Sequence, residues 1–244
     1  MRAARTRLTA LAAAGVVAVA VHGGAAQAAA PSVRYDADTT VTDAGGTYFP
    51  DSTGLGHRGH VEQGSPAGTI RLIAHGAGKA AKFPAGCMAT SCRVIIEAAD
   101  APDLDPGSGD VTWGAQVLLQ PREVTPGANV LQKGFAQGGA GLYKLQADGG
   151  KAGCVMVDTG STNTTVYRAT WATSIADGAW HDLVCRRTGS TLTLTVDGTV
   201  RKRVAIAADL GVSNSAPLRL GGKNTKTGND QFFGALDNAF VQRG

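Results

Sequence analysis

The stretch from Asp177 to Gly198 carries the clearest structural signal in the chain, and it reads DGAWHDLVCRRTGSTLTLTVDG. Its initial Asp-Gly pair predicts a turn, a strand that starts with Trp180 and His181 follows, and a second turn falls around Gly189. Beyond that turn, apolar residues alternate strictly with Thr up to the closing Asp-Gly pair, which favours a two-residue reversal. We therefore predict two antiparallel strands that bury one face.

Short β-rich runs recur along the rest of the chain, separated by clusters of Gly, Pro, Asp and Ser. No long stretch repeats its apolar residues about every 3.6 positions, as an amphipathic helix would. The predicted strands cover residues 69–74, 93–98, 111–119, 130–133, 142–147, 154–157, 165–170, 181–187, 191–196, 200–205, 218–220 and 233–241. This rhythm is typical of an all-β sandwich or barrel, and no linker divides the chain into two domains.

Several motifs, taken in order, resemble those of laminin-G-like domains, which are jelly-roll sandwiches of the concanavalin A-like class. The 177–198 stretch is similar to the family's D-G-x-W-H…L-x-L-x-V-D-G core. Further similar segments are PDSTGLGHRG at 50–59, LDPGSGDVTW at 104–113, QKG at 132–134, YKL at 143–145, LRLGG at 218–222 and FGALD at 233–237. The resemblance covers about residues 50 to 243 and implies a two-sheet antiparallel jelly roll, which we expect over 31–244 as a single domain. Because this fold hosts lectins, adhesion modules and glycosidases, it does not identify the ligand.

Residues 1–28 are predicted to be a signal peptide that is cleaved on export. A basic start with three Arg residues is followed by an apolar stretch from 8 to 21. An A-x-A site ends at Ala28, and an alternative site ends at Ala30. The apolar stretch is shorter than the roughly 20 residues that span a bilayer. We therefore expect a secreted, extracellular protein with no membrane segment.

The charge balance argues against polyanionic partners. Three of the 23 Lys and Arg residues lie in the signal peptide, so the mature chain has 20 basic residues against 19 acidic ones. A nearly neutral chain lacks the electrostatic attraction that nucleic acids and anionic membranes require. We expect neither as a partner, and the sequence leaves the oligomeric state open.

Four cysteines in an exported chain favour two disulfides. Cys87 and Cys92 flank a four-residue loop, and we expect them to close it. Cys154 and Cys185 then remain, each in a predicted strand and in phase with apolar neighbours. Zinc would require C-x-x-C-type spacing, which the chain lacks.

Two kinds of hydrolase compete with a binding function. The segment CVMVDTGSTN at 154–163 resembles the active-site turn of aspartic proteases, where two carboxylates share one proton. A second such turn is absent, because DSTG at 51–54 is one residue too long. We therefore interpret 154–163 as a strand that ends in a turn and keep the protease as a remote alternative.

A glycoside hydrolase would suit the fold better. Concanavalin A-like glucanases carry paired carboxylates on one strand with E-x-D-x-x-E spacing, and this pattern is absent. Glu97 and Asp100 are three residues apart, so in a strand they would face opposite sides. The sequence favours a non-catalytic protein without deciding the question.

The resemblance also implies a possible structural calcium ion at the rim of the sandwich. Asp237, next to the closing strand, is the expected side-chain ligand, with a turn-capping role as the alternative. The Asp-rich loop at 100–110 lacks the EF-hand pattern and is interpreted as turn chemistry.

Sugar recognition needs exposed aromatic rings, and only 5% of the residues are aromatic. Trp113 and Trp180 fall in phase with buried positions, so Trp171 and Tyr167 are the expected ligand-binding platform. Together these features predict a secreted, lectin-like binding module, with an extracellular or cell-wall carbohydrate as its ligand. A protein-binding adhesion domain is the alternative among binding functions.

Overall fold

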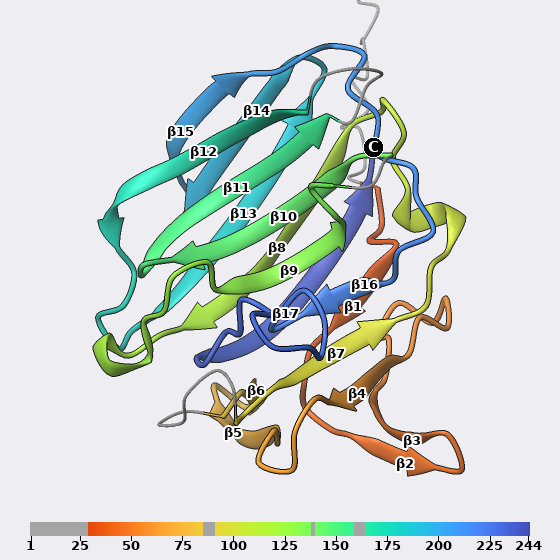
Figure 1. The fold of residues 1–244 in the computed structure, drawn as a ribbon, viewed down its shortest axis with the longest axis vertical. Coiled ribbons are helices and arrows are strands. Elements are labelled where there is room, and N and C mark those ends of the chain that lie inside the picture. Colours follow the sequence, from red (N-terminus) through yellow and green to blue (C-terminus); the bar gives the residue numbers. More distant parts are fainter. Residues whose placement is uncertain (1–28, 85–90, 138–139, 159–163) are drawn as a thin grey trace, which may run out of the picture.

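A computed structural model describes residues 29–84, 91–137, 140–158 and 164–244. Their strands form two antiparallel sheets stacked face to face, which confirms the expected all-β jelly-roll sandwich (Figure 1). Within these residues the helices are two short 3-10 turns, η1 (Pro102–Leu104) and η2 (Pro121–Glu123). No helix in this part of the chain is long and apolar enough to cross a membrane.

In Figure 1 the nine-stranded sheet lies in front of the eight-stranded sheet. In spatial order, the nine-stranded sheet contains β12 (Thr165–Ser174), β11 (Lys151–Asp158), β10 (Leu142–Asp148), β9 (Asn129–Gly134), β16 (Leu218–Leu220), β7 (Val94–Ala98), β4 (Gly59–Gln63), β3 (Gly46–Phe49) and β2 (Val41–Asp43). The eight-stranded sheet contains β15 (Thr199–Ala205), β14 (Thr191–Val196), β13 (Trp180–Thr188), β8 (Val111–Leu118), β17 (Ala235–Arg243), β6 (Gly78–Lys82) and β5 (Arg71–His75), with β1 (Val33–Tyr35) paired to β17.

The 177–198 stretch folds as predicted. β13 and β14 pair antiparallel, with Leu183 opposite Val196. Along β14 the three apolar residues are buried and the threonines between them are half-buried on the other face. Asp197 and Gly198 have φ angles of 52° and 71°, the two positive values that a type I′ reversal into β15 requires.

A disulfide joins the two sheets through the core. Cys154 on β11 is bonded to Cys185 on β13, with the Cα atoms 5.5 Å apart, which confirms this predicted pair. Cys87 lies outside the described residues, so its bond to Cys92 stays a prediction. The expected signal peptide, residues 1–28, also lies outside them.

Between β16 and β17 the chain crosses the face of the nine-stranded sheet that points away from the core, which we call the outer face (Figure 1). The side-chain amide of Gln231 fastens this segment to β7, because it both accepts from Val94 N and donates to Val94 O at 3.0 Å. The carbonyl of Asp230 accepts from Asn129 N at the start of β9. The segment therefore forms a wall along one side of the outer face.

Candidate binding groove on the nine-stranded sheet

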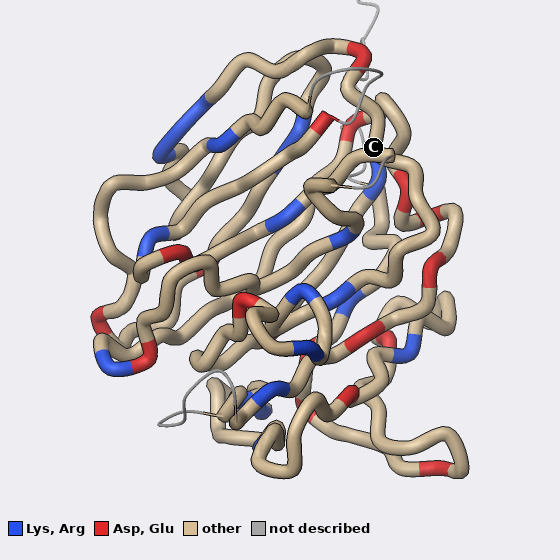
Figure 2. Tube along the Cα trace, viewed as in Figure 1, with Lys and Arg blue, Asp and Glu red and all other residues tan. Residues whose placement is uncertain are grey.

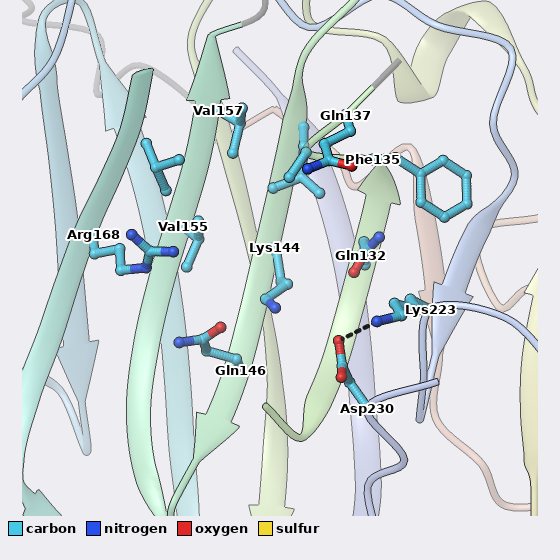
Figure 3. A pocket seen from close by; sticks show the side chains of 13 residues that line it. Gln132, Phe135, Gln137, Lys144, Gln146, Val155, Val157, Arg168, Lys223 and Asp230 are labelled. Atoms are coloured by element: carbon cyan, nitrogen blue, oxygen red, sulfur yellow. Dashed lines mark hydrogen bonds and ion pairs between the residues drawn. The ribbon is translucent and has the colours of Figure 1, made fainter. Parts of the chain in front are cut away.

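A groove of about 420 Å³ lies on the outer face of the nine-stranded sheet, over β9, β10, β11 and β12 (Figure 3). The wall formed by residues 221–234 closes one side of it. Its lining residues are Gln132, Phe135, Ala136, Gln137, Leu142, Lys144, Gln146, Val155, Val157, Val166, Arg168, Lys223 and Asp230.

One row of cross-strand partners runs through the centre of the groove. Gln132 on β9 lies opposite Lys144 on β10, Lys144 opposite Val155 on β11, and Val155 opposite Arg168 on β12. Because side chains alternate along a strand, the neighbours of these residues, such as Leu145 and Cys154, point into the core. Figure 2 shows basic positions on β12, β10 and β16 across this sheet.

The row continues on β16 with Arg219, which lies opposite Gln132. The Nε of Arg219 donates to Glu97 Oε2 at 2.7 Å, and its guanidinium stacks over the ring of Phe135, with 5.1 Å to the centroid. Phe135 is 37% exposed and stands at the end of the groove. The ring of Phe135 is thus held at the end of the groove by Arg219, which is itself paired with Glu97.

The floor of the groove is partly apolar. Leu142, Val155 and Val157 are buried and form a small cluster of their own with Val166, separate from the core between the sheets. These residues give the groove a surface that favours the C–H faces of a ligand, while the polar residues beside them offer hydrogen bonds.

The polar lining residues differ in how well they are satisfied. Gln132 donates to Gly134 O at 2.7 Å and accepts from Asn129 at 2.8 Å, and Lys223 pairs with Asp230 at 3.0 Å. Among the described residues, the side chains of Lys144 and Arg168 have neither a hydrogen bond nor an ion pair. Burial lowers the pKa of Lys144, and Asp230 and Asp148 offset this only in part.

Sequence reasoning missed this groove. Its signal was the alternation in β10, where Lys144 and Gln146 interrupt a run of apolar residues. The strand itself was predicted, but the outward residues of four strands become one site only when their register is known.

The expected aromatic platform lies elsewhere. Tyr167 and Trp171 are half-buried on β12 and pack against the core, on the face opposite the groove residues Val166 and Arg168. The guanidinium of Arg201 stacks over the ring of Trp171, 4.5 Å from its centroid. The ligand-binding role of Tyr167 and Trp171 stays a prediction.

Asp237, the expected calcium ligand, lies on the outer face of the eight-stranded sheet. Its Oδ2 is 2.6 Å from His75 Nδ1 and its Oδ1 accepts from Asn238 N at 2.6 Å. No cluster of three or more His, Cys, Asp or Glu that could hold a metal occurs in the described chain. With both oxygens of Asp237 engaged by nitrogen groups, the residues present do not fit a calcium ion there.

The interpretation of Trp180 as a core residue was wrong. Trp180 is half-buried, and its ring stacks on His75 with 3.8 Å between centroids, beside the 380 Å³ cavity that includes Asp237. His75 lies at the end of β5, opposite Gly78 on β6. Trp113 is fully buried, as predicted.

The two carboxylates considered for catalysis, Glu97 and Asp100, are both engaged in ion pairs. Glu97 pairs with Arg219 at 2.7 Å and Asp100 with Lys133 at 2.7 Å. Glu123, another glutamate, pairs with Lys82 at 2.6 Å. Residues 159–163 of the protease-like turn lie outside the described residues, and Asp158 ends β11. In the described lining of the groove, the only carboxylate is that of Asp230.

The sequence model of the family described as the concanavalin A-like lectin/glucanases superfamily matches residues 97–242. No curated protein matches the chain in sequence. The matched range includes all four strands of the groove.

Solved structures share the fold at low sequence identity. Domain 4 of AbnA, a GH43 extracellular arabinanase from Geobacillus stearothermophilus in complex with arabinotriose, has a TM-score of 0.63 at 18% identity, covering 89% of this chain and 94% of that chain. The binding domain of Paraclostridial mosquitocidal protein 1 has a TM-score of 0.58 at 12% identity, covering 84% and 48%. The receptor binding domain of botulinum neurotoxin D has a TM-score of 0.57 at 9% identity, covering 87% and 48%. The chain spans about half the length of these two toxin domains.

Proposed function

The chain belongs to the concanavalin A-like lectin/glucanases superfamily, and from this membership we propose that it is a secreted, non-catalytic module that binds a carbohydrate. The groove over β9 to β12 is the observation that carries the proposal. It combines an apolar floor with cationic and amide side chains, which is the mixture that a sugar ring with C–H faces and hydroxyl edges requires. The arabinotriose complex of the AbnA domain, which has the same fold, supports this class of ligand.

The chemistry of the groove supports binding over hydrolysis. Glycosidases act through two carboxyl groups that lie roughly 5 to 9.5 Å apart. Asp230 is the only carboxylate in the described lining, and it forms an ion pair with Lys223. A lone, neutralised carboxylate provides neither an acid–base pair nor a nucleophile with its acid.

The predicted export of the chain supports an extracellular ligand. The predicted signal peptide and the Cys154–Cys185 disulfide fit a protein that works outside the reducing cytosol. A carbohydrate of a cell wall or matrix is one class of ligand that such a protein would meet there.

A glycan array with the mature protein, run beside hydrolysis assays on the same polysaccharides, tests the proposal. For the ligands found, we expect Gln146→Ala to weaken binding by roughly 3- to 15-fold, the value of one or two neutral hydrogen bonds. Gln242→Ala is the matched control, because Gln242 lies on β17 in the other sheet. Turnover of a polysaccharide that a single carboxylate substitution abolishes would overturn the non-catalytic assignment.

A further inference from the structure

We infer, resting on the proposed function, that the ligand is an anionic glycan whose carboxylate or sulfate group is bound between Lys144 and Arg168. Both side chains line the groove and flank Val155 in the central cross-strand row. Figure 3 shows the guanidinium of Arg168 extending from β12 over β11 toward Val155, and Lys144 on the other side of that residue.

The other cations near this groove already have anionic partners. Lys223 pairs with Asp230 at 3.0 Å and Arg219 with Glu97 at 2.7 Å. In the described part of the chain, Lys144 and Arg168 have no such partner. The groove therefore presents two cations that no carboxylate contacts directly, and its single carboxylate is paired with a third cation, Lys223.

The environment of Lys144 makes the missing partner significant. Lys144 is only partly exposed, with apolar Val155 beside it, and burial lowers its pKa. A partly desolvated ammonium group that no anion contacts directly is unfavourable, because the more distant Asp230 and Asp148 offset its burial only in part; a bound anion would relieve that cost. A surface lysine in full contact with water would gain little from the same anion.

The spacing suits one anionic group on a sugar unit. Adjacent strands are about 4.8 Å apart, so the backbones of β10 and β12 lie roughly 10 Å from each other, with β11 between them. Two long side chains can close that distance over the small Val155. The planar guanidinium of Arg168 offers two parallel N–H groups to a carboxylate or sulfate, and the ammonium of Lys144 adds a point charge.

Calorimetric titration with charge-matched pairs of glycans tests the inference. Polygalacturonate is compared with its methyl ester to test carboxylates, and dextran sulfate with dextran to test sulfates. We expect the anionic member of at least one pair to bind about tenfold or more tightly, as charge-assisted hydrogen bonds predict. The preferred pair then identifies the anion.

The variants are Lys144→Gln and Arg168→Gln, each expected to weaken binding of the preferred anionic glycan by about tenfold or more. Arg186→Gln is the matched control, because Arg186 is an exposed arginine on β13 of the other sheet; we expect it to leave binding unchanged. Arg168 is exposed at the edge strand, so Arg168→Gln keeps the test valid even if Lys144→Gln does not fold.

Three results would overturn the inference, and they differ in what else they affect. Equal binding of charged and neutral glycans, with both groove variants like wild type, removes the anion but leaves carbohydrate binding in place. Equal weakening by Arg186→Gln and Arg168→Gln shows diffuse attraction to a polyanion instead of a site. Failure to bind any glycan on the array or in the titrations removes the proposed function as well.

Discussion

His181 connects the first residues of β13 to two turns. Its Nδ1 lies 2.8 Å from Asp197 Oδ2, and its Nε2 lies 3.2 Å from Asp177 Oδ1. Burial lowers the pKa of His181, but the hydrogen bonds and charges of the two carboxylates outweigh burial, so the pKa is raised overall. The histidine of the Trp-His pair in the 177–198 stretch thus has a structural role.

This raised pKa predicts how stability depends on pH. A histidine whose pKa is higher in the folded state adds stability that is fully present below its unfolded value of about 6.5 and is lost as pH rises through the folded value. We expect His181→Gln to lower the free energy of unfolding at about pH 5.5 and much less at about pH 8.5. Urea denaturation of both proteins at the two pH values measures this difference, and an equal loss at both would contradict it.

Asp237 offers a test of the calcium expectation. Its two oxygens contact His75 Nδ1 and Asn238 N, so we expect Asp237→Asn to cost about 1 to 3 kcal/mol of stability through the loss of charge-assisted hydrogen bonds. We expect the same loss with calcium and with chelator, and an unchanged wild-type melting temperature when calcium is removed. A chelator that lowers the wild-type value but not that of the variant would place a calcium ion at Asp237.

Among the elements, β11 and β13 are linked covalently by Cys154–Cys185 across a sequence separation of 31 residues. Opening that loop by replacing both cysteines with Ala should reduce the free energy of unfolding by about 3 to 4 kcal/mol, by loop-closure entropy. Replacing Cys87 and Cys92, which close a far shorter predicted loop, should cost less. Guanidinium denaturation of the two double variants measures both losses of unfolding free energy. A larger loss for the variant at Cys87 and Cys92 would refute the ranking.

The two faces of β12 separate the roles of Trp171 and Arg168. Trp171 packs against the core and under Arg201, so we expect Trp171→Ala to reduce stability by roughly 1 to 3 kcal/mol and leave glycan affinity unchanged. Thermal melts and calorimetric titration of the same sample measure both quantities. Lost affinity in a variant that remains folded would restore Trp171 as part of the ligand platform.

The strands with regular alternation or β-branched runs were predicted, and so was the three-residue β16, with its observed bounds. β14 was predicted with its observed bounds, because its apolar residues alternate strictly with Thr along the whole strand. β1, β2, β3, β4 and β6 were missed. β2 and β3 are short and form a hairpin through a Gly-rich turn, so they carry too few side chains to show a periodic pattern.

In the molecule as a whole, the outer face of each sheet carries its own cavity, and the two cavities differ in their lining residues. The groove on the nine-stranded sheet takes its residues from four consecutive strands and from the 221–234 wall, which joins them from far along the sequence. The cavity on the eight-stranded sheet gathers Asp36, His75 and Asp237 from equally distant segments. Both hollows depend on which strands become neighbours.

Local patterns in the chain are sufficient for its class and much of its architecture. Alternation identifies buried faces, and Asp-Gly pairs mark reversals, because these signals act between near neighbours. The Cys154–Cys185 bond was predicted by elimination, once the short loop was assigned to Cys87 and Cys92, and the apolar phase of both cysteines supported it. The groove could be identified only from the tertiary structure. Lys144 and Arg168 belong to one site because the strand register places them on either side of Val155. Neither forms an ion pair in the described part of the chain, because the carboxylates nearby are set by contacts between distant segments. Those contacts cannot be read from the sequence alone.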